Sequence, residues 1–145
     1  MYRHILVALN QSDSAHRALR QAIRLAANFN ATLTAVAVTP ILAPYAAFAA
    51  ALSPEALEIM ETDQQALFAG LLEMARNEAA QHAVQIETIL KSGSVVVSLF
   101  EAVRRNHVDL LVFGILPDQN VLERLLGSIG HKLAQGATCD VLGVH

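Results

Sequence analysis

The stretch "DLLVFGILPDQNVLERLLGS" (residues 109–128) decides the fold class. It begins with a short continuous apolar run, which is typical of a strand buried on both faces of a parallel sheet. Gly114 ends this run, and Gly127 and Ser128 precede a helical pattern that the serine can cap. Many α/β proteins build a phosphate-binding loop in this order, because free N–H groups at a helix start attract an anion. A tight turn followed by a serine cap, with no ligand, satisfies the same spacing.

Strand-like runs and helical spacings alternate along the rest of the chain, with short links. Strands are predicted at 4–9, 32–40, 84–90, 108–113 and 139–144, and helices at 15–30, 53–82, 94–106 and 128–137. Parallel neighbours need crossover connections, so this order predicts an α/β fold with a five-stranded parallel sheet and helices on both faces. The length fits a single domain over 1–145. In the second helix the apolar residues Leu57, Met60, Leu67, Leu71, Ala75 and Ala79 are expected near one face.

Composition narrows the class of protein. Hydrophobic residues make up 54% and charged residues 16% of the 145 residues, as in a packed globule. The net charge is −3 and no basic stripe is present, which argues against nucleic-acid binding. The single cysteine, Cys139, suits a reducing cytoplasm and is interpreted as a small buried side chain. The uncharged segment 25–54 is interrupted by prolines, so no membrane span is expected.

The sequence offers no clear catalytic residue and no metal site. Ser12, Asp13 and His16 fall in the first turn of a predicted helix, where serine and aspartate act as caps. The six histidines show no metal-ligand spacing with a carboxylate or cysteine.

Two apolar segments point to contacts. The uncharged segment 41–52, with Tyr45 and Phe48, either covers the binding edge of the sheet or forms a contact surface. The last strand, 139–144, is expected at an edge of the sheet, where it can pair with another copy.

Three stretches, read together, resemble the universal stress protein family over nearly the whole chain. They are "ILVALNQSDSAHRAL" (5–19), "ATLTAVAV" (31–38) and "VDLLVFGILPDQNVLERLLGSIGHKLAQGATCDVLGV" (108–144). The resemblance implies a Rossmann-like sheet of order 3-2-1-4-5 and a homodimer formed through the last strand. It also implies a small cytoplasmic stress-response protein that acts by binding or regulation and is not a classical enzyme.

The resemblance also assigns a nucleotide site. ATP-binding members of the family carry Gly-x2-Gly-x9-Gly-Ser/Thr, and this spacing is kept here by Gly114, Pro117, Gly127 and Ser128. By the same resemblance Asn10 contacts the nucleoside and Val38 packs on adenine. Gly127, Ser128 and Ile129 match the turn beside the triphosphate.

Two of these positions depart from the pattern of the ATP binders. Pro117 stands in place of a glycine and has no backbone N–H, and losing one donor to an anion costs about 1.5–3 kcal/mol. Asn10 stands in place of an aspartate and presents an amide to the nucleoside. We therefore expect a degenerate nucleotide site in a protein that works through protein contacts. The alternative is a switch that still takes ATP or another adenine nucleotide, and a slow ATPase is the third hypothesis.

Overall fold

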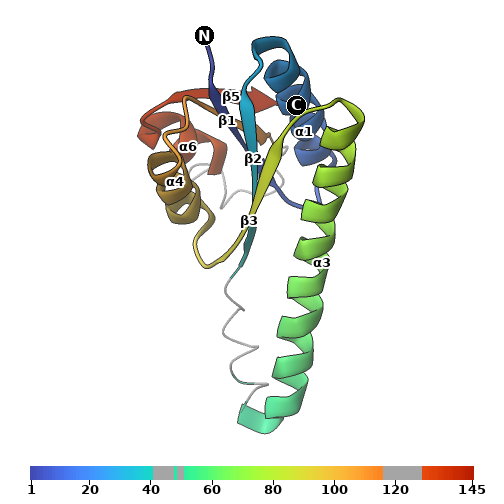
Figure 1. The fold of residues 1–145 in the computed structure, drawn as a ribbon. Helices are drawn as coiled ribbons and strands as arrows, with labels where there is room; N and C mark the ends of the chain where they lie inside the picture. The colour runs from blue at the N-terminus through green and yellow to red at the C-terminus, as the bar shows by residue number, and fades with distance from the viewer. Residues whose placement is uncertain (41–47, 49–50, 116–128) are drawn as a thin grey trace.

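The computed structural model describes residues 1–40, 48, 51–115 and 129–145. Its strands form one five-stranded sheet in the order β3-β2-β1-β4-β5, with every neighbouring pair parallel (Figure 1). The strands are β1 His4–Leu9, β2 Thr32–Thr39, β3 Ile86–Ser92, β4 Leu110–Gly114 and β5 Asp140–Val144. The helices are α1 Asp13–Phe29, α3 Pro54–Gln81, α4 Val95–Arg105 and α6 Ile129–Gly136. The predicted fold class and the strand order are confirmed.

Helices cover both faces of the sheet, α1 and α3 on one and α4 and α6 on the other (Figure 1). Side chains alternate between the faces along a strand, so Ile5 and Val7 join the core beside α1 and α3, whereas Leu6 joins the core beside α4 and α6. The continuous apolar run of β1 follows from this arrangement, because no face of the strand meets water.

Two strands begin later than the apolar runs predict. Val84 and Val108 each donate their backbone N–H at 3.0 Å to a carbonyl in the last turn of the preceding helix. These valines therefore complete helix ends, and β3 begins at Ile86 and β4 at Leu110. The turns contain the left-handed residues Ala83 and His107, and α1 ends in the same way at Asn30, the last residue of the predicted helix.

The core-facing side of α3 differs from the prediction. Its buried residues are Phe68, Leu72, Ala75 and Ala79. Met60 and Leu67, predicted on the core face, are 42% and 49% exposed, and that part of the prediction is wrong. The helix has 28 residues and a length of about 42 Å, whereas the eight residues of β2 span about 26 Å. The sheet therefore covers only the second half of α3. Neither α3 nor another helix of the described residues is apolar enough along its length to cross a membrane.

Candidate functional site

The loop after β1 holds Asn10 in a turn that organises the start of α1. The Asn10 Oδ1 atom accepts hydrogen bonds from the backbone N–H of Ser12 at 2.9 Å and from the Ser12 hydroxyl. Ser12 in turn caps α1 by accepting from the backbone N–H of Ala15 at 3.2 Å. The side-chain oxygen of Asn10 is thus engaged inside the loop, and its other polar group is an NH₂ donor. An aspartate in this turn would retain a second acceptor oxygen for a ribose hydroxyl.

Gly114, at the end of β4, lies against the start of α1. A Cβ atom at this position would be 2.5 Å from the backbone nitrogen of Ala15 and 2.5 Å from the carbonyl carbon of Ser14. Only glycine permits this approach, because the obstructing atoms belong to backbone. Gly114 therefore has a packing role that holds whether or not a phosphate binds nearby, and it brings β4 up to the loop that carries Asn10.

Val38 lies near the carboxyl end of β2 and is 6% exposed. Its side chain joins the core on the α4 and α6 side of the sheet. In the parallel register Val38 pairs with Lys91 of β3, and the following residue, Thr39, donates its hydroxyl to the Lys91 carbonyl at 3.2 Å. Val38 thus stands at the same edge of the sheet as Asn10 and Gly114, on the strand next to β1.

Of the remaining predicted site residues, the structure describes Ile129. Ile129 is the first residue of α6, and its side chain is 48% exposed. Pro117, Gly127 and Ser128 lie outside the described residues, as does most of segment 41–52. The described part of the predicted site is therefore formed by the ends of β1, β2 and β4.

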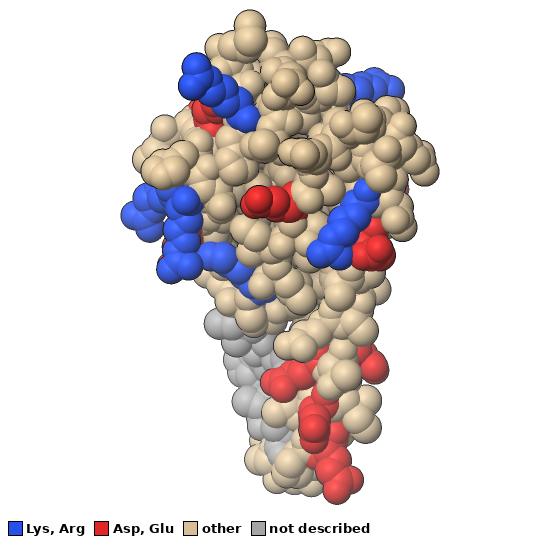
Figure 2. Space-filling view, in the orientation of Figure 1, with Lys and Arg blue, Asp and Glu red and all other residues tan. Residues whose placement is uncertain are grey.

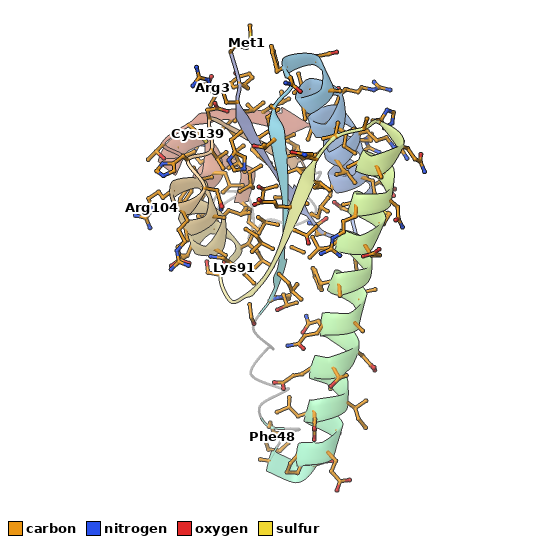
Figure 3. The ribbon with its side chains drawn as sticks, in the orientation of Figure 1. Met1, Arg3, Phe48, Lys91, Arg104 and Cys139 are labelled. Atoms are coloured by element: carbon orange, nitrogen blue, oxygen red, sulfur yellow. The ribbon has the colours of Figure 1, made fainter. Side chains whose placement is uncertain are left out.

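An ion pair at this edge was missed by the sequence reasoning. The Lys91 Nζ atom lies 3.1 Å from Oε2 of Glu101, and this ion pair joins the end of β3 to α4. Figure 3 shows Lys91 beside the turn between these two elements. The hydrogen bond from Lys91, with the charge of its ammonium group, lowers the pKa of Glu101. The available signal in the sequence was the position of Lys91 directly after the alternating pattern of residues 84–90. Its charge is already matched by Glu101, so it is not a free cation for a phosphate.

Ser12 is the helix cap that the sequence predicts, whereas Cys139, predicted to be buried, is only partly so. Ser12 caps α1 and Asp13 lies in its first turn. Cys139 is partly buried against the core beside α4 and α6, and burial raises the pKa of its thiol. A raised pKa reduces the thiolate fraction, which makes this cysteine a poor nucleophile.

A doubly covered parallel sheet with polar residues at the carboxyl ends of β1 and its neighbours defines a Rossmann-like α/β protein, in which ligands bind at that edge. The particular family follows from comparison with known proteins. The model of the Universal stress protein family matches residues 1–145, and the chain belongs to this family, as its sequence predicts.

Individual relatives agree with this assignment. Universal stress protein YxiE of Bacillus subtilis is 32% identical over 146 residues, which cover 98% of each chain. A universal stress protein solved in complex with cAMP is 29% identical, with a TM-score of 0.75 over 99% of this chain and 97% of the other. UspA from Lactobacillus plantarum shares the fold, with a TM-score of 0.80, 24% identity and coverage of 99% and 98%.

Proposed function

We propose that this universal stress protein acts by binding and regulation through protein contacts, in the cytoplasm, and that its nucleotide site is degenerate. The observation that carries the proposal is the turn around Asn10, whose side-chain oxygen is engaged by Ser12. This turn offers a nucleoside a donor in place of the acceptor that an aspartate supplies. Pro117 adds a second deficit on the phosphate side, because proline has no N–H to donate.

The direct test is a calorimetric titration of the purified chain with Mg-ATP. We expect no micromolar binding by the wild type and a gain of about ten- to a hundredfold in affinity for Asn10→Asp combined with Pro117→Gly. Gly70→Ala is a control on α3, since nothing lies within 4 Å of the added Cβ atom and Gly70 is not among the predicted site residues. Micromolar binding of Mg-ATP by the wild type, or ATP retained through purification, would make the protein a nucleotide switch instead.

A second candidate function is binding of an adenine nucleotide with a single phosphate. It is favoured by the relative solved in complex with cAMP at 29% identity. A cyclic monophosphate needs fewer hydrogen-bond donors from the loop than a triphosphate does. The missing N–H of Pro117 therefore lowers the affinity for it less. Binding of cAMP but not of Mg-ATP would support this candidate. Release of inorganic phosphate from ATP would support the slow ATPase instead.

The proposed assembly is a homodimer formed through β5. This strand is at the edge of the sheet and pairs with β4 on one side. Leu142 in its centre is 36% exposed. The outer edge of β5 therefore offers a second copy both an apolar side chain and backbone N–H and C=O groups for strand pairing. We expect sedimentation to give a dimer, and Leu142→Asp to convert it to a monomer. A wild-type monomer would contradict this assembly without affecting the nucleotide result.

A further inference from the structure

The first half of α3, Pro54–Leu67, projects past the carboxyl ends of the strands and is called the α3 arm (Figure 1). Every buried residue of α3 lies at Phe68 or beyond. Isolated helices shorter than ~12–15 residues are marginal in water, and most helical stability comes from packing of an apolar face. The arm therefore presents a surface on which a partner would supply the packing that the sheet does not.

An apolar stripe runs along the arm. Its side chains are Ile59, Met60 and Leu67, with exposed fractions of 61%, 42% and 49%. Met60 precedes Leu67 by one heptad, so the two share a helix face. Ile59 lies about 140° around the helix from the buried Leu72, at 100° per residue. Ile59 thus faces away from the protein's own core, whereas Met60 and Leu67 lie on the flank of the helix, about 60° and 80° from the buried Ala75. Figure 3 shows the exposed Phe48 at the tip of the same arm.

The charge of the arm has one sign. Its charged residues are Glu55, Glu58, Glu61 and Asp63, and the sequence has no lysine or arginine between Arg24 and Arg76. Among the described residues, none of these four acids forms an ion pair. Figure 2 shows acidic side chains along this part of the molecule, and the basic ones over its body. Two arms placed together would repel each other, whereas a cationic surface is complementary.

We propose that the α3 arm is a docking surface for an amphipathic, cationic helix of a partner protein. The partner's apolar side chains would pack on Ile59, Met60 and Leu67. Its lysines or arginines would lie near Glu55 and Asp63, which stand four residues before and after Ile59 on the same side of the helix. The heptad spacing of the stripe suits two helices packed side by side. This inference rests on the proposed action through protein contacts and names the surface and the class of partner. It uses none of the residues assigned to the nucleotide site.

The test uses the full chain and two synthetic helical peptides of equal length with leucine at the same heptad positions. One carries lysine and the other glutamate at the remaining positions. By fluorescence anisotropy we expect the lysine peptide to bind at least about tenfold more tightly than the glutamate peptide, with an affinity that falls as salt rises. Ile59→Ser with Leu67→Ser should weaken that binding by about tenfold or more. Val97→Ser, at an equally apolar site on α4 with 59% exposure, should not.

Charge reversal separates docking from a loss of helix in the arm. Glu55→Lys with Asp63→Lys reverses the two acids beside Ile59 with a residue that is a good helix former, and should transfer the preference to the glutamate peptide. Equal binding of both peptides, or no switch in this variant, would overturn the proposal. Two further results would also overturn it. Self-association of the wild type that Ile59→Ser abolishes would make a second copy the occupant. Binding of the wild type to phosphatidylcholine vesicles that Ile59→Ser abolishes would make a lipid surface the occupant. Peptide binding and Mg-ATP titration are separate readouts, so failure of the docking surface and failure of the proposed function are distinguished.

Discussion

The two halves of α3 belong to one helix but have opposite surroundings. From Phe68 onward the helix buries Leu72, Ala75 and Ala79, and Glu78 lies 3.5 Å from Arg20 of α1. In the arm, large apolar side chains are exposed and the acids form no ion pair with a described residue. The apolar content of the two halves is similar. What separates them is the reach of the sheet, which ends beneath the second half.

Hydrogen exchange should show the largest difference between the halves. Amides of the packed half are expected to exchange only through large-scale unfolding, whereas those of the arm open locally at little cost. The arm should therefore exchange at least ~10³-fold faster, which corresponds to about 4 kcal/mol. Peptide-resolved deuterium uptake measures this ratio. Equal protection of the two halves would mean that the arm is packed in solution and that the contrast between them is wrong.

Matched leucine truncations sharpen the comparison. Leu72→Ala removes a side chain that is 5% exposed and should lower the free energy of unfolding by about 2–4 kcal/mol. Leu67→Ala, one and a half turns away and 49% exposed, should change it by less than ~0.5 kcal/mol. Urea unfolding followed by circular dichroism gives both values. A cost at Leu67 close to that at Leu72 would place the arm in a packed environment.

This contrast also explains how far the sequence predicted the fold. Apolar runs such as residues 4–9 and the cap Ser12 predicted the elements and their order, because backbone burial and capping act over a few residues. Periodicity identified α3 as a helix but not which apolar stripe meets the sheet. That choice depends on where the strands end in space, and no local pattern records it.

The site was predicted unevenly for the same reason. The family resemblance assigned Asn10, Val38 and Gly114 to a nucleotide site, and the structure places all three near the ends of neighbouring strands, while their role in binding stays a prediction. The contact of Gly114 with the backbone of α1 depends on a crossing of elements that lie about a hundred residues apart in sequence. Glycine at a strand end is compatible with several roles until that crossing is known.

Two glycines extend the contrast between packed and open surroundings. Gly114→Ala would place a Cβ atom 2.5 Å from the backbone of Ala15, and we expect a loss of about 1–3 kcal/mol in stability. Gly70→Ala, with nothing within 4 Å at the junction of the two halves of α3, should gain about 0.5–1 kcal/mol from helix propensity. Thermal and urea unfolding of the two variants measure whether each substitution lowers or raises the free energy of unfolding. A stabilising Gly114→Ala would show that the end of β4 does not lie against α1 as described.

The smallest effect expected is electrostatic and contrasts a paired acid of the body with an unpaired one of the arm. Lys91 lowers the folded-state pKa of Glu101, chiefly through their hydrogen bond, below the ordinary value of 4.5. A lowered folded-state pKa contributes stability that is present above the unfolded value and is lost as pH falls through the folded value. Glu101→Gln should therefore reduce the urea midpoint at pH 7, and the difference from wild type should vanish as the pH falls below about 4.5. Glu58→Gln on the arm should change the midpoint less at pH 7, because Glu58 forms no ion pair among the described residues. A difference for Glu101→Gln that grows toward acid pH would show that Lys91 does not stabilise the ionised carboxylate.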